Sequence, residues 1–210
     1  MKNSKTRNKS ARHQYLSHLV DAFPRLRHVL EYVPAKVGLN IEIKYPTEIQ
    51  HSALRALPEF EMNAYIDVIL KVVFDYAGPR RIIFSCFDPD VCVMLRAKQA
   101  RYPVFFLTSA GTDDGYADKR CLSIESALMF AKTEHVQGIV SNSTPFLENP
   151  ELIAAIKREG LILFTWGDKN SDHKAVQFQK MHGVDAVISD NVGDLTKLDG
   201  KLQTITPPSL

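Results

Sequence analysis

The chain has 210 residues, of which 45% are hydrophobic and 24% are charged, a composition close to the globular average. This composition excludes a largely disordered chain, and the length is sufficient to bury a full hydrophobic core. The 26 basic and 24 acidic residues give a net charge of +2, which is too balanced for a protein whose main task is binding nucleic acid. We therefore expect a globular fold and no nucleic-acid partner.

Cysteine usage and the first residues bear on the cellular compartment. The three cysteines include no Cys-x-x-Cys pair, which argues against a disulfide framework and against a zinc site. The opening segment, MKNSKTRNKSARH, is basic but is not followed by the apolar stretch of a secretory signal. No apolar run approaches the roughly 18 residues needed to cross a bilayer. We predict a cytoplasmic protein without a membrane span.

A basic segment precedes a long patterned region. Residues 1–12 contain five Lys and Arg residues and no acidic residue, so we predict a disordered tail there. From His13 onward the spacing of apolar residues predicts a helix, and a second short helix is predicted over Arg25–Tyr32. We expect one domain over residues 13–195 and a C-terminal tail over residues 196–210.

Short apolar segments then alternate with amphipathic ones. Six of them predict strands: Leu39–Ile43, Arg81–Phe84, Val104–Thr108, Gly138–Val140, Leu161–Thr165 and Ala186–Ile188. Five intervening segments predict helices: 61–77, 88–100, 123–133, 149–158 and 172–182. The strands read as continuous hydrophobic runs, which is typical of a parallel sheet covered by helices. This pattern fits either a doubly wound open sheet or part of a (β/α)8 barrel.

The segment GLNIEIKYPTE carries the most informative pair of charges. Glu42 and Lys44 are two residues apart on a predicted strand, so their side chains leave the same face, while Ile41 and Ile43 take the opposite face. We expect both charges to lie inside a barrel or on the buried face of a sheet, where they need a partner or a function. One interpretation is an ion pair that satisfies itself. The other is a site for an anionic, phosphorylated substrate, with Glu42 binding Mg²⁺ or Ca²⁺ and Lys44 contacting phosphate.

Other polar residues are better explained structurally. Asp88 is predicted to be the N-cap of a helix, and Cys86 and Cys92 to be small core residues. Four histidines are interpreted as solvated: His51, His135, His173 and His182. Three aspartates are interpreted as a solvated acidic loop, because their spacing misses the calcium-loop pattern: Asp113, Asp114 and Asp118.

Three segments together, NIEIK, FSCFDPDVCVMLRAKQARYP and LILFTWGD, resemble the glycerophosphodiester phosphodiesterase family, in particular its eukaryotic glycerophosphocholine branch. The resemblance implies a TIM-type (β/α)8 barrel that uses a divalent cation, Mg²⁺ or Ca²⁺, and hydrolyses glycerophosphodiesters to an alcohol and glycerol 3-phosphate. By similarity, Glu42 matches a metal-ligating glutamate and Lys44 a lysine near the phosphate. Phe87 and Trp166 match positions where the family places aromatic residues near the substrate.

The sequence also departs from this family. Two family strands that precede the NIEIK strand carry His-Arg-Gly, Glu-x-Asp and His-Asp motifs, and the residues ahead of Gly38 contain none of them. We therefore predict an α/β fold of the TIM-barrel type that lacks its first two βα units and has open strand edges. Because positioned proton donors are needed for phosphodiester cleavage, we expect this chain alone to be weak or inactive.

Three interpretations of function remain open. The first is an enzyme of this lineage that uses Glu42 and Lys44 with a metal and whose missing residues come from another polypeptide or another splice form. The second is a non-catalytic pseudo-enzyme, regulatory fragment or truncated gene product that binds a protein partner through the open barrel edge. The third is an unrelated doubly wound binding protein, which the inward-facing Glu42 and Lys44 disfavour.

Overall fold

The computed structural model describes residues 23–45, 61–113 and 118–193. The predicted tails, 1–12 and 196–210, and the helix predicted from His13 lie outside the described residues. The described residues divide into two compact units, one within residues 23–39 and 64–81 and a larger one within residues 40–45, 61–63, 82–113 and 118–193. The single domain expected over residues 13–195 stays a prediction.

The smaller unit is built on two helices. They are α2 (Leu26–Tyr32), which matches the predicted short helix, and α3 (Met62–Tyr76), most of which belongs to this unit. The buried side chains of these helices supply the core of the unit: Leu30, Ile66, Leu70 and Val73. On the surface, the Arg27 guanidinium stacks over the Tyr76 ring at 4.5 Å from its centroid.

Arg80 ties the segment after α2 to the end of α3. Its side chain is only 3% exposed, and its two terminal nitrogens donate hydrogen bonds to four backbone carbonyls. Nη1 donates to Pro34 at 2.9 Å and Val37 at 2.6 Å, and Nη2 donates to Leu30 at 3.1 Å and Val33 at 2.5 Å. The Leu30 carbonyl lies in the last turn of α2 and the other three carbonyls follow the helix, a region where the helix itself leaves oxygens without partners.

The larger unit is a parallel sheet. Its six strands lie in chain order: β1 (Leu39–Glu42), β2 (Ile82–Cys86), β3 (Val104–Thr108), β4 (Gly138–Asn142), β5 (Ile162–Trp166) and β6 (Ala186–Val187). Neighbouring strands from β2 to β6 pair in parallel. At β1, the hydrogen bonds from Leu39 N to Arg81 O and from Ile43 N to Ser85 O share one offset, which is the parallel pattern. The predicted α/β fold with six parallel strands is confirmed.

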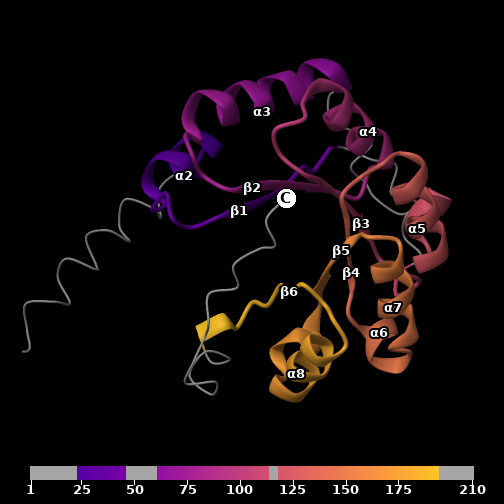
Figure 1. Cartoon of the computed structure of the whole chain (residues 1–210). Coiled ribbons are helices and arrows are strands. Elements are labelled where there is room, and N and C mark those ends of the chain that lie inside the picture. Colours follow the sequence, from indigo (N-terminus) through magenta and orange to yellow (C-terminus); the bar gives the residue numbers. More distant parts are fainter. Residues whose placement is uncertain (1–22, 46–60, 114–117, 194–210) are drawn as a thin grey trace, which may run out of the picture. The chain divides into compact units, whose positions relative to one another are not determined.

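Helices cover one face of this sheet. They are α4 (Pro89–Lys98), α5 (Ile124–Thr133), α6 (Thr144–Glu148), α7 (Glu151–Arg158) and α8 (His173–Met181), with short 3-10 helices η2 (Lys119–Cys121) and η3 (Asp168–Ser171). Because strands in sequential order with right-handed connections place every helix on the same side, α4 to α8 lie on one face (Figure 1). This is the arrangement of a barrel wall and not of a doubly wound sheet, whose helices cover both faces.

The two faces of the sheet differ in packing. The face opposite the helices carries a cluster of Phe105, Leu107 and Val140. Half-buried side chains pack against it: Ile83, Phe87, Ile162, Phe164 and Trp166. We call this the inner face. The helix-covered face contains the buried Cys86 and, on α4, Cys92, so their predicted core role is confirmed.

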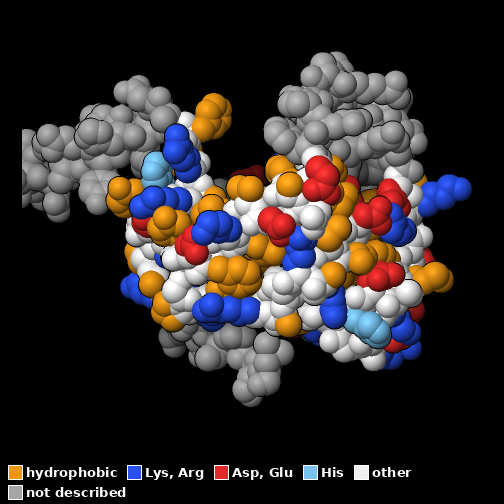
Figure 2. Space-filling model, turned by 90° about the horizontal axis from the view of Figure 1, so that it is seen from above, with side chains coloured by type: hydrophobic (Ala, Val, Ile, Leu, Met, Phe, Trp, Pro, Cys, Tyr) orange, Lys and Arg blue, Asp and Glu red, His pale blue; other side chains and the backbone are white. Residues whose placement is uncertain are grey.

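Charges on the surface are mixed in sign. On the face shown in Figure 2, acidic and basic side chains are interspersed with hydrophobic ones, and neither sign gathers into one patch. Within residues 23–45, 61–113 and 118–193, the helices are too short or too polar to cross a membrane.

Candidate functional site

Glu42 is the last residue of the edge strand β1, and Lys44 follows it two positions later. Glu42 Oε1 is 3.4 Å from Lys44 Nζ, and the two side chains are 37% and 79% exposed. They share the inner face as predicted, while Ile43 is buried on the other side. The expectation that both charges are buried is wrong, because β1 is an edge strand of the described sheet and water reaches its inner face.

The register of β1 against β2 gives these two residues neighbours. Ile43 N donates to Ser85 O at 2.8 Å. In a parallel ladder this bond places Glu42 beside Ser85 and Lys44 beside Phe87 on the inner face. The Ser85 side chain is 1% exposed, and its hydroxyl has no hydrogen-bond partner among the described residues. On this face the unpartnered Ser85 hydroxyl thus lies next to an exposed carboxylate, and the buried indole Nε1 of Trp166 likewise has no hydrogen-bond partner among the described residues.

Phe87, the residue after β2, and Trp166, the last residue of β5, meet on the inner face. Their ring centroids are 6.1 Å apart and the rings are almost perpendicular, at 80°. Both pack against the cluster that contains Leu107 and Val140. The aromatic pair therefore covers the apolar inner face near the carboxyl ends of the strands, which is the end where parallel α/β folds bind ligands.

The four predicted site residues thus form a row of neighbours. Glu42 contacts Lys44, Lys44 lies beside Phe87, and the Phe87 ring meets the Trp166 ring. The arrangement combines a carboxylate, an ammonium group and an aromatic surface. Their assigned roles, in binding metal, phosphate and substrate, stay predictions.

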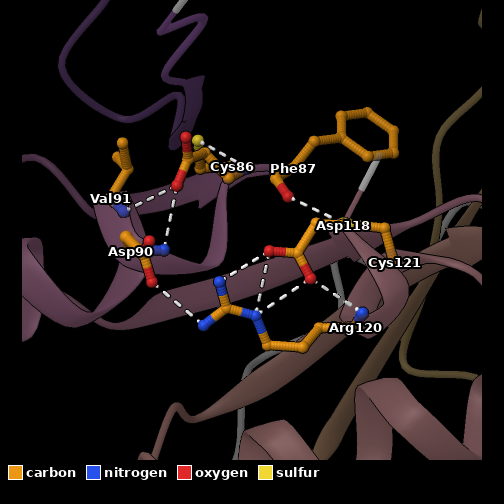
Figure 3. Close-up of polar contacts among 8 residues, drawn as sticks. Cys86, Phe87, Asp90, Val91, Asp118, Arg120 and Cys121 are labelled. Atoms are coloured by element: carbon orange, nitrogen blue, oxygen red, sulfur yellow. Dashed lines mark hydrogen bonds and ion pairs between the residues drawn. The ribbon is translucent and has the colours of Figure 1, made fainter. Parts of the chain in front are cut away.

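A second polar cluster stands at the start of α4, where Asp88 is the N-cap; Figure 3 labels its neighbours Phe87, Asp90 and Val91. The Asp88 carboxylate accepts hydrogen bonds from Asp90 N at 2.9 Å and Val91 N at 3.1 Å, which confirms the predicted cap. Burial raises the pKa of this carboxyl group above its usual value, and the two amide hydrogen bonds oppose that shift. Asp88 follows Phe87 directly, so the cap fixes the chain beside the aromatic pair.

Arg120 joins this cap to the segment after β3 (Figure 3). It donates to Asp118 from Nε at 3.0 Å and from Nη2 at 2.6 Å, and to Asp90 from Nη1 at 2.9 Å. These hydrogen bonds lower the pKa of the Asp118 carboxyl group. The next residue, Cys121, donates from its thiol to the Phe87 carbonyl at 3.1 Å. We call the contacts of Arg120 with Asp118 and Asp90 the Arg120 junction.

The Arg120 junction was missed from the sequence, and it corrects one interpretation. Asp118 was expected to be solvated in an acidic loop, but it is paired with Arg120 instead. Asp113 is exposed, and Asp114 lies outside the described residues. Of the histidines expected to be solvated, His135 and His182 are exposed and His173 is half-buried, while His51 lies outside the described residues.

The described residues do not complete a site for a divalent cation. In the described ranges no three His, Cys, Asp or Glu side chains form a group that could hold a metal ion. Glu42 offers one carboxylate, and the ammonium of Lys44 beside it repels cations. Mg²⁺ requires about six oxygen ligands, of which proteins commonly supply one or two carboxylates. Glu42 is therefore suited to be one ligand among several and cannot hold such a cation alone.

Comparisons with known proteins agree with this architecture. The sequence model of the glycerophosphoryl diester phosphodiesterase family matches residues 1–194. The chain therefore belongs to this family. It is 40% identical over 177 residues to a glycerophosphocholine phosphodiesterase of Rattus norvegicus, covering 82% of this chain and 26% of the relative. It is 42% identical over 193 residues to one of Schizosaccharomyces pombe, covering 90% of this chain and 17% of the relative.

A solved structure shares the fold. An Oleispira antarctica phosphodiesterase, determined with the product sn-glycerol-3-phosphate, matches with a TM-score of 0.57 at 18% identity. The match covers 78% of this chain and 56% of that one. The chain thus spans about a quarter of the first curated relative, about a sixth of the second and just over half of this solved structure.

Proposed function

We propose that the chain takes part in the hydrolysis of glycerophosphodiesters, glycerophosphocholine in particular, to an alcohol and glycerol 3-phosphate. In this proposal Lys44 contacts the phosphate, Phe87 and Trp166 contact the organic part of the substrate, and Glu42 is one ligand of a divalent cation, Mg²⁺ or Ca²⁺. The observation that carries the proposal is the row of neighbours from Glu42 to Trp166 along the inner face of a barrel-type sheet. The cytoplasmic location belongs to the same proposal and is supported by three free, buried thiols.

Hydrolysis of a phosphodiester requires groups that transfer protons, in addition to the binding residues of this row. Water must lose a proton as it attacks phosphorus, and the leaving alcohol must gain one. Among the described residues no group of three His, Cys, Asp or Glu side chains gathers as a metal site, and the carboxylate that follows Phe87, Asp88, is engaged as the N-cap of α4. General acid and base groups contribute roughly 10²–10⁴-fold each to rates of this kind. We therefore expect the chain by itself to retain affinity for fragments of the substrate but to hydrolyse the substrate slowly or not at all.

The test is a choline-release assay on the purified chain with glycerophosphocholine and an excess of Mg²⁺ or Ca²⁺. Glu42→Gln is the matched control, because an exposed ion pair contributes no more than about 1 kcal/mol and the variant should fold normally. We expect no turnover above that of Glu42→Gln. Turnover that Glu42→Gln abolishes would contradict this expectation and would direct attention to histidines outside the described residues, such as His13 and His18.

A second candidate function is binding of a protein partner at the edges of the sheet, without catalysis. The observation in its favour is that β1 and β6 each pair with one strand only in the described sheet, and unpaired strand edges are templates for a further strand. The chain alone should then show fast amide exchange along β1 and β6 and slow exchange in β3 and β4. Equal protection of edge and central strands would argue against an available edge.

A further inference from the structure

Three polar side chains from three different elements form a closed ring of hydrogen bonds behind β5. Thr165 lies on β5, Asn170 on η3 and Gln179 on α8, and each is fully buried, with 0% exposure. Thr165 Oγ1 donates to Gln179 Oε1 at 2.6 Å, Gln179 Nε2 donates to Asn170 Oδ1 at 2.9 Å, and Asn170 Nδ2 donates to Thr165 Oγ1 at 3.3 Å. We call these three residues the Thr165 triad.

Every side-chain donor hydrogen of the Thr165 triad has an acceptor. The second hydrogen of Asn170 Nδ2 goes to the carbonyl of Ile188 at 3.0 Å, and the second hydrogen of Gln179 Nε2 goes to the carbonyl of Ala175 at 3.2 Å. A buried polar network that is fully satisfied fixes the orientation of its members, because any rotation leaves a donor or an acceptor without a partner. An apolar core of the same volume can be equally stable, but it does not fix the orientation of its side chains as this network of hydrogen bonds does.

The Thr165 triad closes the short segment that contains Trp166. Thr165 stands immediately before Trp166, and Asn170 lies at the other end of the segment, where its N–H also donates to Gly167 O at 2.9 Å. Gly167 turns the chain with a φ of +113°, a backbone conformation that favours glycine. The ring of hydrogen bonds thus joins both ends of residues 165–170, with the indole projecting from between them onto the inner face.

We propose that Thr165, Asn170 and Gln179 are positioning residues for Trp166. They hold the indole against Phe87 and so set the shape of the aromatic surface at the carboxyl ends of the strands. The same ring fixes the end of β6, because Ile188 N donates to Thr165 O at 2.8 Å while its carbonyl accepts from Asn170. As far as it concerns substrate, this inference rests on the proposed function, in which Trp166 contacts the glycerophosphodiester.

The test uses the fact that Trp166 is the single tryptophan of the chain, so that intrinsic fluorescence reports on this position alone. Thr165→Val keeps the volume of the side chain and removes its hydroxyl, whereas Thr165→Ser keeps the hydroxyl and removes a methyl group. If hydrogen bonding positions the indole, acrylamide should quench Thr165→Val on the order of two-fold more strongly than wild type, with Thr165→Ser close to wild type. If Thr165 only fills space, the order is reversed, and that result would overturn the inference.

A second pair of variants guards against general loosening of the fold. Gln179→Met removes the buried amide of α8, and Gln177→Met makes the same change at an exposed position of the same helix. Both should retain the wild-type far-ultraviolet circular dichroism at the temperature of measurement. We expect only Gln179→Met to increase the quenching of Trp166. Equal quenching in the two variants would contradict a positioning role.

Ligand titrations separate this inference from the proposed function. Glycerophosphocholine and sn-glycerol 3-phosphate are added to wild type, Thr165→Val and Thr165→Ser while the emission of Trp166 is followed. We expect a ligand-dependent change in wild type and Thr165→Ser, and a weaker apparent affinity in Thr165→Val. If no ligand changes the emission of any of the three proteins, the substrate role of Trp166 fails, while the order of quenching still decides whether the Thr165 triad positions the indole.

Discussion

Arg80 shows how a single buried cation organises backbone. It reaches four carbonyl oxygens in and after the last turn of α2 through two nitrogens that diverge from one planar group. A lysine at this position brings one nitrogen with three hydrogens, so it cannot reach both pairs of carbonyls. The function of Arg80 is therefore tied to the geometry of the guanidinium and not only to its charge.

From this geometry we predict that Arg80→Lys is destabilising. Leaving buried carbonyls without donors costs about 1–3 kcal/mol, so we expect the free energy of unfolding to fall by that amount. Urea unfolding followed by circular dichroism measures it. Arg81→Lys is the control, because Arg81 is the neighbouring residue and is exposed. A loss no larger than that of Arg81→Lys would show that the four carbonyls do not depend on the guanidinium.

Asp118 carries a prediction about pH. Its hydrogen bonds to Arg120 lower its pKa in the folded chain below the usual 3.8. A carboxyl group with a lowered folded pKa stabilises the protein above its unfolded pKa, and this stabilisation is lost as the pH falls through the folded pKa. We expect Asp118→Asn to lower the free energy of unfolding at neutral pH and to make that free energy less dependent on pH below about 4.

The corresponding measurement is urea unfolding of wild type and Asp118→Asn from pH 7 down to pH 3. Asp88 has the opposite sign, since burial raises its pKa, and its protonation in acid does not oppose folding. If the stability of the two proteins falls in parallel over the whole range, the pairing of Asp118 with Arg120 does not contribute to acid sensitivity.

At the scale of elements, α4 begins where a side chain replaces a missing helical hydrogen bond. Asp88 accepts from Asp90 N and Val91 N, two of the amides that a helix start leaves without partners. We predict that Asp88→Ala lowers the free energy of unfolding by about 1 kcal/mol. Asp88→Asn keeps the acceptor and avoids a partly buried charge, so it should be at least as stable as wild type. Thermal unfolding of both variants checks this, and equal losses would argue against the cap.

Strands and helices could be predicted where the local pattern of apolar residues is enough to specify the secondary structure. Val104–Thr108 was predicted with its observed bounds, because five apolar or β-branched residues in a row leave little alternative. The helix predicted over residues 149–158 is observed as α7, but the preceding α6 was missed. α6 has only five residues, too few for the periodicity that identifies a helix.

The candidate site was predictable only in part. Glu42 and Lys44 could be placed on one face from their spacing alone, since strand side chains alternate. Their exposure could not, because it depends on whether another strand covers β1, which no local pattern encodes. The Arg120 junction and the Thr165 triad were missed because they also depend on contacts between residues that are distant in the sequence. Arg120 meets Asp90 across 30 positions of sequence, and Thr165 meets Gln179 across 14.

At the scale of the whole molecule, all three cysteines are free and buried. Burial raises the pKa of Cys121 to about 12 and raises that of Cys92 well above its usual value. Because the thiolate is the reactive form, we expect the native chain to react slowly with a thiol reagent such as dithionitrobenzoate, and all three thiols to react once urea unfolds it. A thiol that reacts rapidly in the native chain would show that this core opens.

The order of the strands has a consequence for how the protein is made. Every strand of the described sheet hydrogen-bonds only to the strand before it and the strand after it in the chain. Each new strand that leaves the ribosome therefore finds its partner already synthesised, and no early strand has to wait for a distant one. The described sheet can grow vectorially during translation, one strand and one helix at a time, and β6, held by two register pairs, is the last of its six strands to be added.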